Sequence, residues 1–342
     1  MPTRQETTTG RWLTQRGPLV VLVLGMFAAL WLSETVAAEE KSWRPLAPML
    51  QERFEHACAL VGDTFYVFGG YGKGVKTSNH VQAFDLAKNK WRRLRDMPSA
   101  ITHVNAVVDG RSVWLAGGFK DGYPGKAINE VWKYDVDKNT FMAAPSLPEP
   151  RAGGGLALVG RRLHYFGGLK KDRDTDSADH WVLDLDATRS AAKWKSAAAM
   201  PAPRNQFGTV THQGKIYAIG GQFHHDSRSG KPALDQARVD IYDPATDSWS
   251  SGPALPGPHS HAENSTFLHD GRIIVIGGRS VNRVETAIWV LPPAGKWRQL
   301  GKLPVPLIGP AARIIDGRLV VAGGAPRGFD PLSAVWAQTL SQ

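Results

Sequence analysis

A pair of adjacent glycines recurs six times along this chain, and its spacing limits the folds that the chain can adopt. The pairs are Gly69-Gly70, Gly117-Gly118, Gly167-Gly168, Gly220-Gly221, Gly277-Gly278 and Gly323-Gly324. Successive first glycines are 48, 50, 53, 57 and 46 residues apart, and each pair ends a short apolar run such as TFYVFGG or RIIVIGG. A period of about 50 residues is typical of a four-stranded sheet that must stack on its neighbours to bury both faces.

Two further features recur within each repeat. A short turn such as Asp109-Gly110 precedes each apolar run and predicts a hairpin between an innermost strand and a second strand. An outer Trp or Phe follows an aromatic or apolar residue by seven positions in Phe84–Trp91, Tyr134–Phe141, Tyr242–Trp249 and Val290–Trp297. This pattern closely resembles the kelch repeat and spans Trp43 to about Leu340. The resemblance implies an all-β fold, a six-bladed kelch β-propeller.

The sixth repeat has no outer strand of this pattern after Trp336. The segment 41–46, KSWRPL, has the missing pattern ahead of the first repeat. We therefore predict that this N-terminal segment pairs as the outer strand of the last blade and closes the ring, which removes an exposed strand edge. Deleting residues 41–48 is then expected to lower the melting temperature of the whole domain.

Residues 1–38 have the features of an export signal. Three arginines precede an apolar run, Leu19–Leu32, and small residues lead up to Ala38. The run is short for a spanning helix, so we expect a signal peptide over residues 1–38 and the propeller over residues 39–342. An uncleaved N-terminal anchor is the alternative, and it would be the only contact with a membrane. In either case we expect the propeller to be periplasmic or secreted.

The formal net charge of +10 favours anionic partners, such as acidic carbohydrates. The basic residues are spread along the chain rather than clustered in runs, and we expect no nucleic-acid partner. The single cysteine excludes an internal disulfide. We expect a monomer without a cofactor, whose partner is an anionic carbohydrate or a protein.

Ligands of a propeller meet the loops that enter the innermost strands and the loops that follow the second strands. The residues of these loops lie sixteen and thirteen positions before each first glycine, next to those positions, or directly after each glycine pair. Many of them are Arg or His, so we expect one mouth of the propeller channel to be basic and His-rich. The ligand-binding candidates are Arg53, His56, His103, Asn105, Arg151, Arg204, Gln222, His259 and Arg279. Such a mouth suits a carboxylate or polyhydroxyl ligand, because Arg binds carboxylates bidentately. Alternatively, these side chains only hydrate the channel entrance and pair between blades.

The densest cluster is His259, His261 and Glu263 in the fifth repeat. On an extended strand these alternate residues share one face. His261 and Glu263 are therefore the candidate acid/base pair, and all three are a less favoured metal site. The loop 172–179 resembles a calcium loop but has Ser177 where the motif needs Gly, so we interpret it as a solvated acidic loop.

Two enzyme families with kelch propellers were compared with these residues. Galactose-oxidase-like copper enzymes need a Tyr-His ligand pair, and the chain has no Tyr-His dipeptide. The periplasmic sialic acid mutarotase (N-acetylneuraminate epimerase) group is similar in its export signal, its six kelch repeats and its size. That resemblance implies acid/base and carboxylate-binding roles that Arg151, Arg204, His261 and Glu263 could fill. We therefore rank a binding module first, a sugar mutarotase second and a metal-dependent enzyme third.

Overall fold

The computed structural model describes residues 1–2, 42–188, 191–225, 232–281 and 283–339, and Trp43–Leu340 form one compact unit. The unit is an all-β propeller whose only helices in the described part are two 3-10 turns, η1 (Lys73–Val75) and η2 (Glu263–Ser265). None of the helices described is long and apolar enough to cross a membrane. The expected signal peptide or anchor lies almost wholly outside the described residues and stays a prediction.

The strands of the propeller form four-stranded antiparallel sheets, numbered here one to six in chain order. Sheet one contains β2 (Ala57–Val61), β3 (Thr64–Phe68), β6 (Val81–Asp85) and β7 (Lys90–Arg93). Sheet two contains β9 (Asn105–Asp109), β10 (Ser112–Ala116), β13 (Val131–Asp135) and β14 (Thr140–Ala143). Sheet three contains β15 (Gly155–Val159), β16 (Arg162–Phe166), β17 (His180–Asp184) and β18 (Lys195–Ser196).

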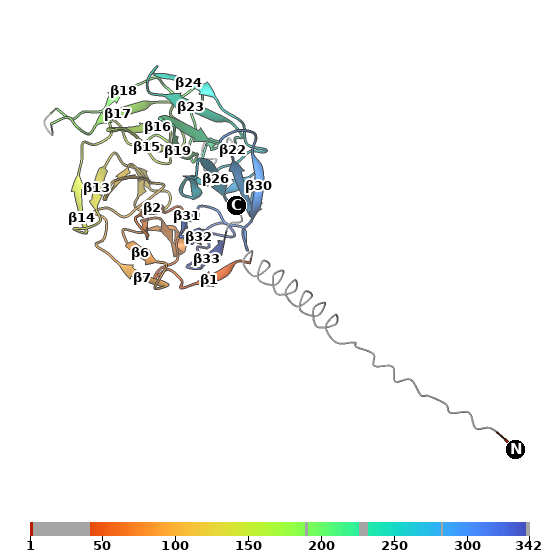
Figure 1. Ribbon diagram of the computed structural model, residues 1–342. Coiled ribbons are helices and arrows are strands. Elements are labelled where there is room, and N and C mark those ends of the chain that lie inside the picture. The colour runs from red at the N-terminus through yellow and green to blue at the C-terminus, as the bar shows by residue number, and fades with distance from the viewer. Residues whose placement is uncertain (3–41, 189–190, 226–231, 282, 340–342) are drawn as a thin grey trace. The chain divides into compact units, whose positions relative to one another are not determined.

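The remaining three sheets repeat this order. Sheet four contains β19 (Gly208–His212), β20 (Lys215–Ile219), β23 (Val239–Asp243) and β24 (Ser248–Ser251). Sheet five contains β25 (Thr266–His269), β26 (Arg272–Ile276), β29 (Ala287–Leu291) and β30 (Arg298–Lys302). Sheet six contains β31 (Ala311–Ile315), β32 (Arg318–Ala322), β33 (Val335–Thr339) and β1 (Arg44–Leu46). Figure 1 shows innermost strands such as β2, β15, β19 and β31 toward the centre and outer strands such as β7, β14 and β24 at the rim.

Short strands decorate the loops at the ends of these sheets. They are β4 (Tyr71–Gly72), β5 (Lys76–Thr77), β8 (Ile101–Thr102), β11 (Phe119–Lys120), β12 (Lys126–Ala127), β21 (Gln222–Phe223), β22 (Leu234–Asp235), β27 (Arg279–Ser280) and β28 (Arg283–Val284). β8 pairs with β11, and β11 with β12, whereas the other six form two-stranded ribbons. Most of these ribbons begin directly after a glycine pair, so they raise polar loop residues around one end of the propeller.

The glycine pairs are required because each one touches the next sheet. The second glycine of each pair donates its N–H to a carbonyl oxygen of the following sheet's entry loop at 2.7–2.9 Å, from Gly70 to Ile101 through to Gly324 to Arg53. A Cβ on the first glycine would collide with that same carbonyl, at 2.7 Å for Gly277 and 2.6 Å for Gly323. Both glycines also have positive φ, which other residues adopt only with strain.

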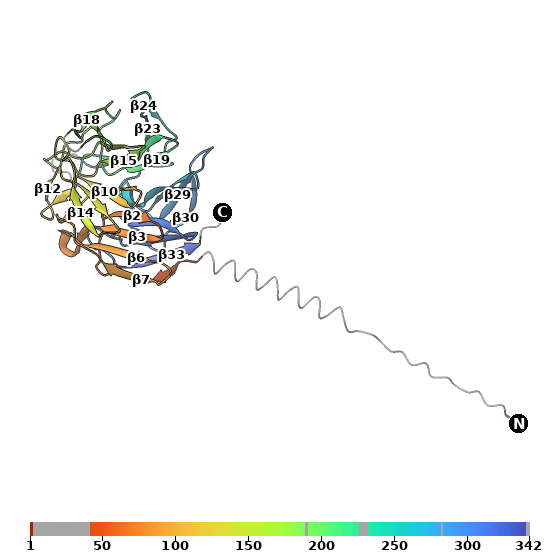
Figure 2. The same ribbon diagram turned by 60° about the vertical axis from the view of Figure 1, so that its left-hand side comes forward.

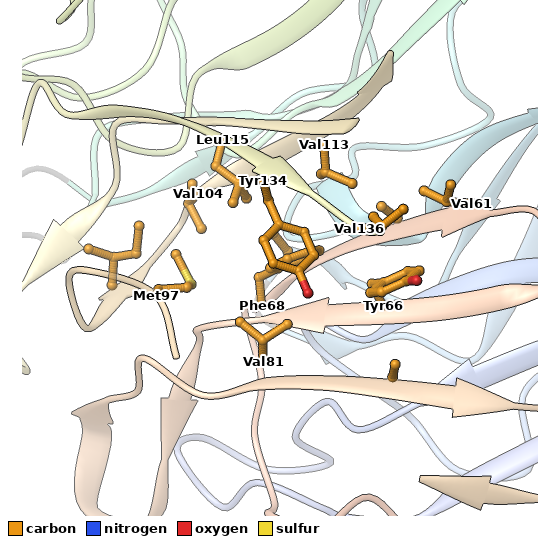
Figure 3. Close-up of a cluster of buried hydrophobic side chains, with 14 of the residues drawn as sticks. Val61, Tyr66, Phe68, Val81, Met97, Val104, Val113, Leu115, Tyr134 and Val136 are labelled. Atoms are coloured by element: carbon orange, nitrogen blue, oxygen red, sulfur yellow. The ribbon is translucent and has the colours of Figure 1, made fainter. Parts of the chain in front are cut away.

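Apolar side chains fill the space between neighbouring sheets. Figure 3 shows the cluster between sheets one and two, where Tyr66, Phe68 and Val81 meet Val113 and Tyr134. The Tyr134 ring packs edge-on against Phe68, with their centroids 5.5 Å apart. Equivalent clusters join the other sheets, so the hydrophobic core is a set of inter-sheet layers around the propeller.

The outer tryptophans of sheets one, three, four and five each form a hydrogen bond to the sheet before them. The indole N–H groups of Trp91, Trp194, Trp249 and Trp297 donate at 2.8–2.9 Å to carbonyl oxygens of Ala47, Pro145, Ala198 and Pro253. These carbonyls lie about 50 residues earlier in the chain, which is one repeat. The regular Trp spacing in the sequence therefore reflects a hydrogen bond between sheets as well as burial.

Strand β1 pairs antiparallel with β33 in the register Arg44 to Ala337, Pro45 to Trp336 and Leu46 to Val335. Figure 2 shows β33 next to strands of sheet one such as β6, and the two sheets share one hydrophobic cluster. The predicted partner of this segment and the observed partner are thus the same strand.

Candidate functional site

Six residues where the chain enters the innermost strands form a ring around the propeller axis, which we call the inner ring. They are Glu55, His103, Gly153, Gln206, His261 and Gly309, and all have φ between 50° and 63°. Each N–H donates to the carbonyl oxygen of the preceding member at 2.8–3.3 Å, and Glu55 completes the circle by donating to Gly309. The left-handed backbone explains the two glycines, and the other four positions place polar side chains over the channel.

A cavity of about 280 Å³ opens at this end of the propeller. Its lining includes three members of the inner ring, Glu55, His103 and His261. The remaining lining residues come from the loops around them: Phe54, Tyr71, Tyr123, Arg173, His225, Arg279, Val284, Ile308, Gly328 and Phe329. Of the predicted ligand-binding residues, the structure brings His103 and Arg279 into this cavity, together with the candidate catalytic residue His261.

The carboxylate of Glu55 lies between two imidazoles from other sheets. His103 Nε2 is 3.2 Å from Glu55 Oε2, and His261 Nε2 is 3.8 Å from Glu55 Oε1. Gln206 Nε2 donates to Glu55 Oε1 at 3.4 Å. Burial, together with nearby Arg279, lowers the pKa of His261 well below its ordinary value, so His261 is neutral at pH 7. The cavity thus holds a carboxylate and a neutral imidazole that can exchange protons with a ligand.

Two guanidinium groups lie in the lining of the cavity, and that of Arg279 forms an ion pair with the buried carboxylate of Asp235. Arg279 Nη2 donates to Asp235 Oδ1 at 2.8 Å and to the side-chain oxygen of Gln222. Arg173 is 2% exposed, and its guanidinium carbon lies 3.9 Å from the ring centroid of Phe119 and 5.0 Å from that of Tyr123. Such stacking holds an arginine in place, and Arg173 Nη2 also donates to the Tyr71 hydroxyl at 3.3 Å.

The position of Arg173 corrects the interpretation of loop 172–179 as a merely solvated acidic loop. Asp172 does remain exposed and caps a turn by accepting from Thr175. Asp176, however, is partly buried and accepts from Asn205 Nδ2 at 2.6 Å and from the His224 N–H at 2.7 Å. Burial raises the pKa of Asp176. The loop folds inward and delivers Arg173 to the cavity, which the pattern of acidic residues did not indicate.

Aromatic rings form one wall of the cavity. Phe54 contacts Tyr71 and Phe329 with ring centroids 5.5 and 6.2 Å apart, and Phe329 lies 5.9 Å from Tyr123. Phe329 and Tyr123 are 58% and 42% exposed, although they are large apolar residues. The cavity therefore combines an aromatic wall at its rim with charged and imidazole groups deeper inside.

Three predicted ligand-binding arginines lie elsewhere. Arg53 donates to the carbonyl oxygens of Gly69 and His80 at 2.9 Å. Arg204 donates to Gly220 at 2.8 Å and forms an ion pair with buried Asp240 at 2.7 Å, and Arg151 is paired with Asp179. All three side chains are fully buried and are not part of the described cavity lining. They hold the sheet ends together, so we do not include them in the proposed site.

The other predicted residues are also packed inside the propeller. Burial lowers the pKa of His56 to about 3 and that of His259 to about 4, and both rings pack against glycines of the pairs. Asn105 donates to the Gly154 carbonyl oxygen from β9. Gln222 lies just behind the cavity and reaches it through its bond to Arg279. These side chains support the site rather than line it.

The prediction that His259, His261 and Glu263 share one face of an extended strand is wrong. His261 has φ 57°, and residues 263–265 form η2, so the chain turns where an alternating strand was expected. This turn adds two residues to the fifth repeat between the entry loop and the glycine pair. His259, whose carbonyl oxygen accepts from Gly221 as that of Arg53 accepts from Gly324, is therefore the equivalent of Arg53. Counting back sixteen residues from Gly277 gave His261 instead. Burial raises the pKa of Glu263 to about 7, but Glu263 is not in the described cavity lining.

No cluster of three or more His, Cys, Asp or Glu side chains suited to a metal ion occurs among the described residues. We therefore do not carry the metal alternative at His259, His261 and Glu263 further. Sequence reasoning also missed Glu55. The candidate positions were sixteen and thirteen residues before the first glycine of each pair, whereas five members of the inner ring lie fourteen residues before it. A third count at that offset would have found Glu55 and Gln206.

Comparisons with known proteins agree on the repeat. Residues 32–286 match the family model described as the Attractin/LZTR1 beta-propeller. The chain is 24% identical to Kelch repeat-containing protein At3g27220 of Arabidopsis thaliana, over 84% of this chain and 72% of that protein. It is 27% identical to Kelch-like protein terF of Aspergillus terreus, over 80% of this chain and 61% of that protein.

Kelch domain-containing protein 3 of Homo sapiens is 25% identical over 80% of this chain and 77% of its own length. A solved structure, described as the structure of YjhT, superposes with a TM-score of 0.69 and covers 85% of this chain and 95% of that one. At 16% identity this likeness shows the fold alone.

Proposed function

This chain belongs to the Attractin/LZTR1 β-propeller family of kelch-repeat proteins, and we propose that its cavity binds a small anionic ligand of the acidic-sugar class. The observation that carries the proposal is the pair of guanidinium groups, Arg173 and Arg279, beside an aromatic wall in one cavity. The described lining holds these two groups and one carboxylate, Glu55. Arginine favours carboxylates, because its planar fork donates two parallel hydrogen bonds to them.

The rest of the lining suits a sugar ring. Glu55, His103 and His261 offer acceptors and donors for hydroxyl groups, while Tyr123 and Phe329 offer apolar faces at the rim. A cavity of about 280 Å³ is close to the lower end of the range for small-ligand sites, about 300 Å³. The volume of the cavity favours a monosaccharide. The largest ligand that it could hold is the terminal residue of a polysaccharide.

We predict that Arg173→Met weakens the binding of an acidic monosaccharide by about 10- to 100-fold, because a hydrogen bond to a charged group contributes about 1.5–3 kcal/mol. Isothermal titration calorimetry with N-acetylneuraminate and glucuronate, against their neutral counterparts, measures this loss. Arg93→Met is the matched control, because Arg93 is exposed and pairs with Asp96 away from the cavity. Equal binding of acidic and neutral sugars by the unaltered protein would contradict the proposal.

A protein partner is the alternative occupant of the same mouth. Exposed Tyr123 and Phe329 could then be contact residues, and replacing both by Ser should abolish partner capture. If an acidic sugar competes with the protein partner for binding, the sugar and the partner share one site.

A second candidate function is acid/base catalysis on the bound sugar, such as exchange of its anomers. The observation that favours it is the position of Glu55 between His103 and His261. We predict that Glu55→Gln slows anomer exchange by about 10²–10⁴-fold, since a positioned acid or base contributes about that much. Exchange is measured by NMR with an excess of substrate.

Glu263→Gln is the informative comparison for this assay. It tests the residue that the sequence pattern favoured, and its side chain is outside the described cavity lining. Loss of exchange in Glu263→Gln with full activity in Glu55→Gln would return the catalytic role to Glu263. Loss in Glu55→Gln alone would support the cavity.

We also infer that the six four-stranded sheets are the blades of one closed ring and that β1 closes it. Several contacts of the N-terminal segment support this inference. Trp43 Nε1 donates to Lys302 at the end of β30 at 2.8 Å, and β1 pairs with β33. The Ala47 N–H donates to Asn89 of sheet one at 2.8 Å. The segment thus touches sheets five, six and one, and it leaves β33 with no open edge.

A further inference from the structure

A chain of hydrogen bonds reaches from a buried carboxylate to the imidazole of His261. Asp235 lies in β22, and its side chain is 2% exposed. Ser260 Oγ donates to Asp235 Oδ1 at 2.6 Å. The same hydroxyl lies 2.7 Å from His261 Nδ1. Both distances are typical of strong hydrogen bonds.

The donors and acceptors of this chain can be oriented in only one way while Asp235 is ionised. Asp235 also accepts from Arg279 and from the backbone N–H of Val281, so it acts as an acceptor throughout. The one hydroxyl proton of Ser260 is therefore used on Asp235, and its oxygen must accept from His261 Nδ1. A neutral imidazole with its proton on Nδ1 has a lone pair on Nε2.

We propose that Ser260 and Asp235 are positioning residues that hold His261 in the Nδ1–H tautomer and present its Nε2 to the cavity as a proton acceptor. This inference deepens the second candidate function, acid/base chemistry on a bound sugar, and rests on it for its purpose. Nε2 lies 3.8 Å from Glu55 Oε1, which is beyond a hydrogen bond. A ligand hydroxyl that lies beside this pair, within hydrogen-bond distance of both atoms, can donate its proton to either acceptor.

The same carboxylate also orients the cationic part of the cavity. Arg279 donates to Asp235 and to Gln222, Gln222 Nε2 donates to Gln206 at 2.7 Å, and Gln206 donates to Glu55. The network therefore runs from Glu55 through two glutamines, Arg279, Asp235 and Ser260 back to His261. Each hydrogen bond in this network has one donor and one acceptor. Asp235 therefore couples the position of the His261 imidazole to that of the Arg279 guanidinium group.

The test is the tautomer of His261, measured without ligand by two-bond 1H–15N correlation NMR of the full chain labelled at histidine. The signal is assigned by its disappearance in His261→Gln. We expect a pyridine-like nitrogen at Nε2 and a pyrrole-like nitrogen at Nδ1. Ser260→Ala and Asp235→Asn should each lose this pattern and shift His261 toward the Nε2–H tautomer, which free imidazole side chains favour.

Ser260→Thr keeps the hydroxyl and should keep the tautomer, which separates a hydrogen-bonding role from a packing role. Ser250→Ala, on exposed strand β24, is the control for labelling and assignment. A protonated Nε2 in the unaltered protein would overturn the inference, as would an unchanged tautomer in Ser260→Ala. Because no ligand is present, failure of sugar binding would reject the proposed function and leave this measurement valid.

Discussion

Lowering the pH from 7 to 5 should destabilise this propeller by several kcal/mol, because it buries histidines in their neutral form. Burial lowers the pKa of His56 and His164 to about 3 and that of His180 and His259 to about 4. In the unfolded chain the same side chains titrate near 6.5. Below that pH the unfolded chain binds more protons than the folded one, so the free energy of unfolding falls as the pH falls.

The size of the effect follows from the same values. Each such histidine lowers the free energy of unfolding by about 1.4 kcal/mol per pH unit below 6.5, or about 2 kcal/mol at pH 5. Four of them together approach the whole stability of an ordinary domain, about 5–15 kcal/mol. Glu263 acts in the opposite direction, because its pKa is raised to about 7 and the folded state takes up its proton first. The stability gained from Glu263 offsets the loss from little more than one of these histidines.

Urea unfolding at pH 7.5, 6.5, 5.5 and 5.0 measures this dependence. The buried pair His164 and His180, with Nδ1 and Nε2 3.0 Å apart, is the sharpest target. His164→Gln should make the dependence on pH shallower, even if it lowers stability at pH 7.5. His212→Gln is the control, because His212 is half-buried at the end of β19. Equal free energies of unfolding at pH 7.5 and 5.0 would refute the prediction.

Deleting residues 41–48 should lower the melting temperature by about 10 °C. The deletion removes β1, the indole of Trp43 and the packing of Leu46 and Ala47 against the core between sheets one and six. Exposing side chains of this size costs about 1.5–3 kcal/mol for each large one, so we expect a loss of about 4 kcal/mol. For a domain of this size, 1 kcal/mol corresponds to about 2–4 °C.

Differential scanning calorimetry measures the shift. Arg44→Ala, an exposed position within β1, is the control and should leave the melt unchanged. If the deletion does not fold, Trp43→Ala and Leu46→Ala provide smaller steps in the same direction. A deletion variant that melts at the unaltered temperature would contradict closure by β1.

The sequence alone determined the repeating parts of this fold. The glycine pairs and the outer tryptophans follow from contacts that recur along the chain: the bond from Gly118 to Arg151 has an equivalent in every repeat, and that from Trp249 to Ala198 has equivalents in most repeats. A contact that recurs leaves a residue at a fixed spacing, so it can be counted along the chain. The pairing of the segment around Trp43 could be predicted for the same reason, because it has the pattern that the sixth repeat lacks.

The cavity was decided only by tertiary structure. His103, His261 and Arg279 were expected at one mouth, but Glu55 and Arg173 were not. Glu55 reaches the cavity through a left-handed backbone whose N–H bonds to Gly309 of another sheet, and Arg173 reaches it through a loop that folds inward onto Phe119. Such positions depend on how six different loops converge across the ring. No local period records that convergence, because each loop contributes only once.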